Sequence, residues 1–117
     1  MLRTGFAREV ITPEIGAPLC GYFNLRPNQG ALDDLFVKVL LFERHGIVTG
    51  LITYDLCFIS REIITDVRQR LTTSGFDHPE NLLFCATHTH SGPYTVELCG
   101  HERNNEYAAY TVDKTVQ

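Results

Sequence analysis

The chain has 117 residues, which is enough for one small domain with a single hydrophobic core. Its hydrophobic fraction of 44% and charged fraction of 21% are typical of a globular protein. The formal net charge is −4 and the Lys and Arg residues are scattered, which argues against a nucleic-acid-binding surface, because no basic stripe is available to neutralise phosphates. No apolar run approaches the length of about 18 residues that a membrane-spanning helix needs.

The N-terminus lacks the apolar core of a secretory signal, and the four cysteines contain no Cys-x-x-Cys pair. We therefore expect reduced thiols in a cytoplasmic protein, while secretion stays open if a signal has been removed. Cys57 and Cys85 lie in or beside apolar runs and are expected in the core. Cys99 lies in a polar segment, where a role as a soft metal ligand is the alternative to plain exposure.

Three strands are predicted in the first half of the chain. Residues 4–12 form the first, which Pro13 ends, and residues 35–44 form the second. The turn signal His45-Gly46 leads into a third strand over residues 47–56, so this pair is expected to be an antiparallel hairpin. Because the third strand is apolar on both faces, we expect it to be central in the sheet and covered on both sides.

A helix and a fourth strand follow. Ser60 is the expected N-cap of a helix over residues 61–74, whose apolar residues repeat at helical spacing, and Gly75 is its expected C′ residue. The apolar run 82–86 is the fourth strand. Strand, helix and strand form a βαβ unit with parallel strands, whose carboxyl ends point the same way. The predicted fold class is α/β: a mixed sheet with an antiparallel hairpin and a βαβ unit, with helices packed on it.

Residues 104–117 are predicted to form the last helix, capped by Asn104 or Asn105. No Gly, Pro or other C-cap signal occurs before Gln117. We therefore expect a single domain over residues 1–117 that is an incomplete part of a larger domain, truncated in its last helix. A sheet cut from a larger domain leaves a face or an edge exposed, so self-association through that surface is expected.

The richest group of candidate metal-binding and catalytic residues is in the heptapeptide Thr87-His88-Thr89-His90-Ser91-Gly92-Pro93, which follows the fourth strand. In an extended chain, residues two apart point to the same side at a spacing of roughly 6.6 Å, so the two histidines are expected to share a face. A His-x-His pair at a strand exit indicates a metal or catalytic site, and ordinary core or surface histidines are the alternative.

Asp55 ends the third strand, as the heptapeptide follows the fourth. Ligands bind at the carboxyl edge of open α/β sheets, so we expect Asp55 on the same rim as His88 and His90. There it would accept the second N–H of either imidazole and fix its tautomer. The alternatives are that Asp55 caps the following helix or pairs with an arginine.

The heptapeptide resembles the signature of the neutral/alkaline, non-lysosomal ceramidases. The resemblance extends from Gly5 to the last helix, nearly the whole chain. It rests on the heptapeptide together with Gly5, Ile11-Thr12-Pro13, Pro18-Leu19-x-Gly21-Tyr22, the acidic pair Asp33-Asp34 and the strand that ends in Asp55.

The ceramidases of this family are zinc amidohydrolases that cleave the N-acyl bond of ceramide with metal-activated water. The resemblance implies that His88 is a zinc ligand and that His90 lies near the scissile amide as a hydrogen-bonding or proton-handling group. The family completes its single zinc site with a second His, a Glu and a Tyr well downstream of this motif, so those ligands are absent from this chain. The chain is thus expected to be the N-terminal portion of a ceramidase-like catalytic domain.

Three further residues are candidates for substrate binding. Tyr22 is an aromatic residue of the opening motif, and Ser91 and Gly92 offer backbone N–H groups. Aromatic packing and a plain tight turn are the respective alternatives. His101 and Glu102 are candidate local ligands, although their polar neighbours favour a solvated loop.

The expected function is therefore the N-terminal segment of a zinc-dependent amidohydrolase that acts on a small-molecule or lipid amide. One alternative is a metal-dependent hydrolase of a different small amide or ester. Another is a non-catalytic module that keeps the fold and binds a ligand or partner.

Overall fold

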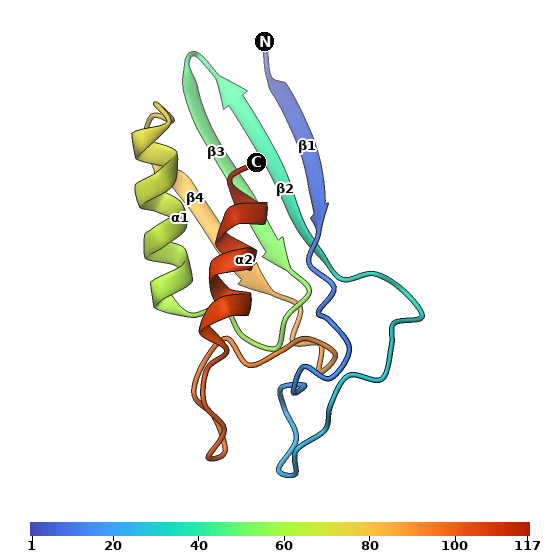
Figure 1. Ribbon diagram of the computed structural model, residues 1–117. Helices are drawn as coiled ribbons and strands as arrows, with labels where there is room; N and C mark the ends of the chain where they lie inside the picture. Colours follow the sequence, from blue (N-terminus) through green and yellow to red (C-terminus); the bar gives the residue numbers. More distant parts are fainter.

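A four-stranded sheet runs in the order β1-β2-β3-β4 and carries two helices (Figure 1). The computed structural model describes residues 1–117. The elements are β1 (Arg3–Val10), β2 (Phe36–Arg44), β3 (Ile47–Tyr54), α1 (Arg61–Thr73), a short 3-10 turn η1 (Pro79–Asn81), β4 (Leu82–Ala86) and α2 (Asn105–Thr115). Every expected strand and helix forms within two residues of its predicted bounds. Neither helix has the length and apolar character needed to cross a membrane.

The strand pairing confirms the mixed sheet. β1 pairs with β2 and β2 with β3 in antiparallel fashion, whereas β3 and β4 are parallel neighbours joined by α1. His45 and Gly46 have φ values of 55° and 80°. Two successive residues of positive φ are what a two-residue type I′ hairpin turn requires, and this turn sets Arg44 opposite Ile47.

Local signals position α1. The Ser60 side chain accepts a hydrogen bond from the Ile63 N–H, as an N-cap does. At the other end Gly75 has a φ of 87°, its N–H donates to the Thr72 carbonyl, and the Phe76 N–H donates to the Leu71 carbonyl. This pair of hydrogen bonds is the Schellman motif. The predicted cap residues at both ends of α1 are therefore confirmed.

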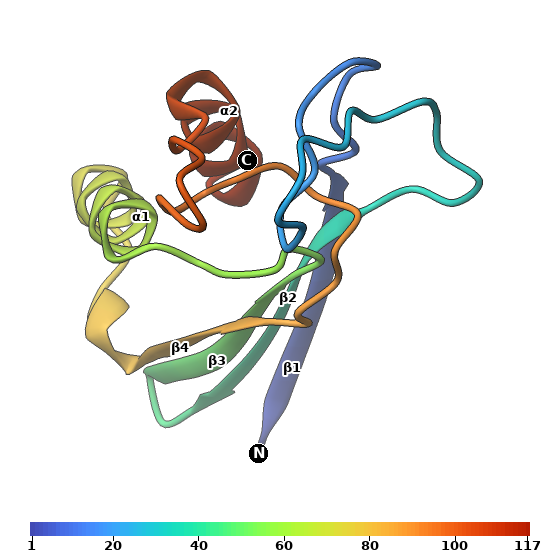
Figure 2. The same ribbon diagram turned by 90° about the horizontal axis from the view of Figure 1, so that it is seen from below.

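The helices lie side by side on one face of the sheet (Figure 2). Ile63 and Val67 of α1 meet Ala108 and Val112 of α2, and all four are at most 2% exposed. A second cluster lies between the helices and the sheet, and its buried residues are Ile11, Val37, Ile52, Tyr54, Leu56, Leu82 and Tyr107. These two clusters hold α1, α2 and the carboxyl ends of β3 and β4 in fixed positions.

The other face of the sheet, here called the outer face, carries no covering layer (Figure 2). The strand register aligns Phe6, Leu40, Leu51 and Leu83 in one apolar row across it. Phe6 is 67% exposed and Leu83 60% exposed. The prediction that β3 is covered on both sides is therefore wrong. β3 alternates between buried and exposed residues, because both helices lie on the same side of the sheet.

Candidate metal centre

After β4 the chain runs beside the segment that follows β3. This places the heptapeptide at the carboxyl edge of the sheet. The Thr87 N–H donates to the Tyr54 carbonyl at 2.9 Å and the His88 N–H to the Leu56 carbonyl at 3.0 Å. His88 itself has a φ of 64°, in the left-handed region. The expected extended geometry of the two histidines is therefore wrong, because the strand has already ended at Ala86.

The two imidazoles nevertheless converge. Their Nε2 atoms are 3.5 Å apart, and the ring planes are nearly perpendicular at 88°. The left-handed turn at His88 accounts for a separation far shorter than the roughly 6.6 Å of extended chain. The expectation that the side chains of His88 and His90 lie close together is confirmed, and their use as a site stays a prediction.

The tautomer of His88 follows from its hydrogen bonds. His88 Nδ1 lies 2.9 Å from the Cys57 carbonyl oxygen. A carbonyl only accepts, so Nδ1 carries the proton and the neutral ring leaves a lone pair on Nε2. The His90 Nε2–H is then the donor in the contact between the two rings. A metal-binding histidine usually donates its other N–H in this way, which orients the ring and raises its basicity.

The nitrogen spacing fits a zinc ion. Tetrahedral zinc with Zn–N bonds of about 2.0–2.1 Å holds two nitrogen ligands roughly 3.3–3.4 Å apart. The observed 3.5 Å between the two Nε2 atoms is close to this spacing. The Cys57 thiol is also close, since ligand atoms of Cys57, His88 and His90 all lie within 4.8 Å of one another.

The Cys57 thiol lies 3.5 Å from His88 Nδ1, on the side of the ring turned away from the Nε2 contact. Cys57 is 2% exposed and packs with Cys20 and Tyr94. Burial raises the pKa of the Cys57 thiol, and a smaller opposing effect comes from its hydrogen bond with Cys20. The thiol is therefore protonated at neutral pH, and Cys57 contacts His88 mainly as a backbone acceptor and a packing partner.

Gly21 positions the ring of His90. A Cβ at Gly21 would lie 2.3 Å from His90 Nδ1, well inside contact distance, and Gly21 has a φ of +98°. The opening motif thus approaches the heptapeptide so closely that only glycine fits. Tyr22 meets the His90 ring edge-on with 5.8 Å between centroids, and the Arg26 guanidinium lies over the Tyr22 ring, 4.6 Å from its centroid.

The remaining residues of the heptapeptide join it to the opening motif. The Gly92 carbonyl accepts the Cys20 N–H at 2.8 Å, and Pro93 bridges to Leu19. Gly92 is buried, and a Cβ there would lie 2.8 Å from a Leu56 methyl group. Ser91 is exposed and borders a cavity of about 380 Å³ whose lining includes Leu19, Asn28, Asp33 and Asp34. Substrate binding by Tyr22, Ser91 and Gly92 stays a prediction.

Asp55 does not join the histidines. Its Oδ2 accepts the Phe36 N–H at 3.0 Å and pairs with the Lys38 ammonium at 2.9 Å, and neither histidine is a partner. These contacts place the carboxylate on the outer face of the sheet. The inferred role of Asp55 in fixing a histidine tautomer is therefore not supported by its hydrogen bonds, and the Cys57 carbonyl occupies that role instead.

The other candidate ligands lie apart from the histidine pair. His101 packs against Tyr94 at 5.0 Å between ring centroids, with Nε2 3.4 Å from the Phe23 carbonyl. Glu102 and Cys99 are exposed. Sequence reasoning missed Cys57 as a partner of His88. Cys57 lies just past the carboxyl end of β3, on the edge where His88 was expected, and this position was the signal that could have identified it.

An antiparallel hairpin followed by a βαβ unit defines a mixed α/β fold, and the His-x-His pair lies at its carboxyl edge. The structure is similar to the neutral ceramidase from Pseudomonas aeruginosa, with a TM-score of 0.83 and 24% sequence identity over 98% of this chain. A ceramidase complexed with C2 matches with a TM-score of 0.81 and 23% identity, also over 98% of this chain.

The ceramidase-like fold that the sequence resemblance implied is thus confirmed. The chain spans about a fifth of the length of these solved structures, 20% of each. No family model matches the chain, and no curated protein matches its sequence.

Proposed function

We propose that this chain is the N-terminal segment of a zinc-dependent amidohydrolase resembling neutral ceramidase, which cleaves an N-acyl amide bond. The observation that carries the proposal is the pair of Nε2 atoms 3.5 Å apart, with the lone pair of His88 directed by the Cys57 carbonyl. The fold similarity to two ceramidases supports the same interpretation.

In this proposal His88 holds the zinc ion through Nε2. When bound there, zinc supplies a Lewis acid that polarises a carbonyl and lowers the pKa of a water molecule. His90 presents its Nε2 beside the ligand atom, where it donates a hydrogen bond to the substrate carbonyl or moves a proton to the leaving amine. Phe58 lies edge-on to His88 with 5.3 Å between ring centroids, and Tyr22 lies edge-on to His90 at 5.8 Å, so aromatic rings flank both imidazoles while His88 stays exposed.

The chain carries only part of such a site. His88 with His90 beside it, and no further ligands, holds zinc weakly, since affinity follows the number and type of ligands. In the ceramidase family the other ligands lie downstream. We therefore expect this chain to bind zinc with modest affinity and to show little or no turnover by itself.

The substrate class is a lipid amide, as the ceramidase likeness suggests. A hydrolase of a smaller, more polar amide or ester is the second candidate. It is favoured by the cavity beside Ser91, whose lining includes the polar residues Asn28, Asp33 and Asp34 and which is not a long apolar groove. The length dependence of turnover on the acyl chain separates these two candidates.

The first test is a calorimetric zinc titration of the chain and its variants. His88→Asn removes the imidazole while keeping a residue that tolerates the left-handed backbone. His45→Asn is the matched control, because His45 has a φ of 55° and lies in the exposed hairpin turn. We expect one zinc per chain, at least tenfold weaker binding in His88→Asn, a smaller loss in His90→Asn, and no change in His45→Asn. Equal affinity in all four proteins would refute the metal site.

The second test concerns activity. The polypeptide that carries this segment should hydrolyse N-acyl amides, and a chelator or His88→Asn should abolish the hydrolysis while His45→Asn preserves it. Comparing acyl chains of about 2 and 16 carbons distinguishes the small-amide from the lipid-amide candidate. Turnover that survives both the chelator and His88→Asn would overturn the proposed function.

A further inference from the structure

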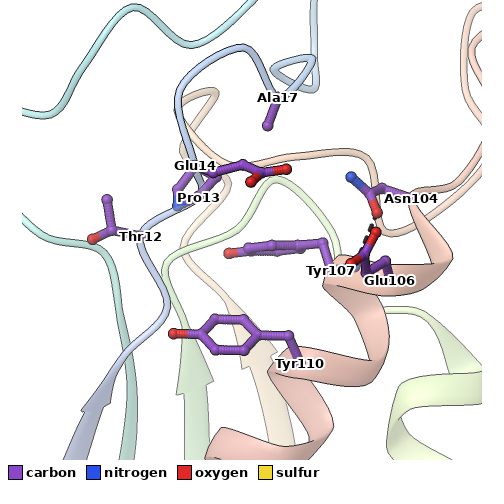
Figure 3. Close-up of a pocket in the computed structure, with 8 residues that line it drawn as sticks. All are labelled: Thr12, Pro13, Glu14, Ala17, Asn104, Glu106, Tyr107 and Tyr110. Carbon is purple, nitrogen blue, oxygen red and sulfur yellow. Dashed lines mark hydrogen bonds between the residues drawn. The ribbon is translucent and has the colours of Figure 1, made fainter.

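A second cavity lies away from the histidines, between the loop after β1 and the first turns of α2 (Figure 3). Its volume is about 380 Å³, within the range of small-molecule sites. Its lining residues are Thr12, Pro13, Glu14, Ala17, Asn104, Glu106, Tyr107 and Tyr110. None of them is Lys, Arg or His.

The loop wall of this cavity is fixed by one buried side chain. Asn28 is 7% exposed, and its amide nitrogen donates to the Pro13 and Glu14 carbonyls at 3.0 Å each. Its backbone also exchanges two hydrogen bonds with this loop, to Gly16 and Ala17, each at 2.8 Å. The loop is therefore held in place before any ligand arrives.

The helix wall is fixed as well. The Tyr107 hydroxyl donates to the Ile11 carbonyl, and the Tyr110 hydroxyl donates to the Val10 carbonyl at 3.1 Å. Asn104 caps α2 by accepting the Tyr107 N–H at 2.9 Å. The two tyrosine rings, with centroids 6.1 Å apart, are thus clamped between α2 and the end of β1 (Figure 3).

Both acidic side chains of the cavity lack a cationic partner. Glu14 extends over the Tyr107 ring, and Glu106 rises from α2 near Asn104 (Figure 3). Neither Glu14 nor Glu106 takes part in an ion pair of this structure. The Lys114 ammonium lies 6.0 Å from the Tyr110 centroid, but it pairs with Glu9 and does not line the cavity.

From this arrangement we propose that the cavity between Glu14 and α2 binds a small organic cation, an alkylammonium or quaternary ammonium group. Carboxylates attract the charge, and tyrosine rings attract it through their quadrupoles while packing against its alkyl groups. An anion would meet the two negative charges of Glu14 and Glu106. A neutral ligand of the same shape would use the rings alone. The proposal does not depend on the metal centre or on amide hydrolysis.

The test uses choline as the probe and 3,3-dimethylbutan-1-ol as its neutral isostere. Binding to the 117-residue chain is followed by NMR shifts of the tyrosine ring protons at low salt. We expect choline to bind in the millimolar range, and the isostere at least fivefold more weakly. Raising the salt concentration should weaken choline binding, because salt screens exposed charges.

Variants locate the site. Glu14→Gln and Glu106→Gln should each weaken choline binding about 2- to 5-fold, the size expected for partly exposed charge pairs. Tyr110→Leu should weaken it by a similar factor, whereas Tyr110→Phe keeps the ring and should bind nearly as well. Glu97→Gln is the matched control, since Glu97 is exposed and lies outside the cavity.

Three results would overturn the proposal. They are no detectable binding of choline, an isostere that binds within twofold of choline, and a loss in Glu97→Gln as large as in Glu14→Gln. If Glu14→Gln fails to fold, Glu106→Gln on the opposite wall decides the outcome alone.

Discussion

Gly21→Ala should disturb the candidate metal centre by displacing the ring of His90. Gly21 has a φ of +98°, where an L-residue is strained, and its added Cβ would lie 2.3 Å from His90 Nδ1. The backbone strain costs about 1–3 kcal/mol. Turning the His90 ring away from its preferred rotamer adds about 0.5–1.5 kcal/mol. We expect a total loss of about 1.5–4.5 kcal/mol in the free energy of unfolding.

Gly16→Ala separates the two contributions. Gly16 has a φ of +91°, close to that of Gly21, but a Cβ added there would meet no atom within 4 Å. It should therefore lose only the strain energy, measured by urea unfolding in parallel. Gly21→Ala should also weaken zinc binding at least tenfold, while Gly16→Ala leaves it unchanged.

A double-mutant cycle with His90→Ala checks the cause. If the ring is what the new methyl group meets, Gly21→Ala should cost about 0.5–1.5 kcal/mol less in the His90→Ala background. A coupling energy of zero, or a Gly21→Ala variant as stable as Gly16→Ala with full zinc affinity, would refute the inferred clash between a Cβ at Gly21 and the His90 ring.

Three further predictions concern other parts of the fold. Ser60→Ala removes the hydroxyl that accepts the Ile63 N–H at 3.3 Å, and should lower the free energy of unfolding by about 1 kcal/mol in urea melts. An unchanged urea midpoint would show that this cap does not stabilise α1. Asp55→Asn breaks the ion pair with Lys38 and should lower the free energy of unfolding by at most about 1 kcal/mol while leaving zinc affinity intact. A zinc affinity reduced tenfold or more would indicate that Asp55 orients one of the histidines. The pKa of the Cys20 thiol is raised to about 12, mainly by burial and then by Cys57, so its stabilising effect is complete below the unfolded value of 9.0 and is lost as the pH rises towards 12. Cys20→Ala should flatten the fall in stability between about pH 9 and 10 under reducing conditions, and Cys99→Ala should not; equal slopes would contradict the assignment.

Elements with a local cause were predictable from the sequence. The cap at Ser60, the Gly75-Phe76 exit from α1 and the His45-Gly46 turn each depend on residues within a few positions of one another. The covering of β3 was not predictable in this way. Apolar residues on both sides of a strand indicate only which side chains can be buried. Whether a helix covers each face depends on the whole fold, and here both helices lie on the same face.

The site shows the same division. The order of strands placed the carboxyl ends of β3 and β4 together, and this was enough to bring His88 near Cys57. The side-chain direction of Asp55 follows a period of two: Tyr54 points into the core, so Asp55 points to the outer face. The left-handed backbone of His88 has no signal in its residue type, and the Cys57 carbonyl is a backbone group that no side-chain pattern reveals.

His88 occupies a backbone conformation that its own residue type does not favour. At a φ of 64° a histidine costs about 1 kcal/mol relative to glycine. His88→Gly relieves this strain but also loses the hydrogen bond to the Cys57 carbonyl, worth about 0.5–1.5 kcal/mol, so the free energy of unfolding in urea should change little while zinc binding is lost. A residue whose replacement by glycine leaves stability unchanged and abolishes binding is kept for binding and not for folding. A glycine scan of the other non-glycine residues at positive φ, His45, His78 and Cys99, would show whether this behaviour belongs to the candidate metal centre or to left-handed turns in general.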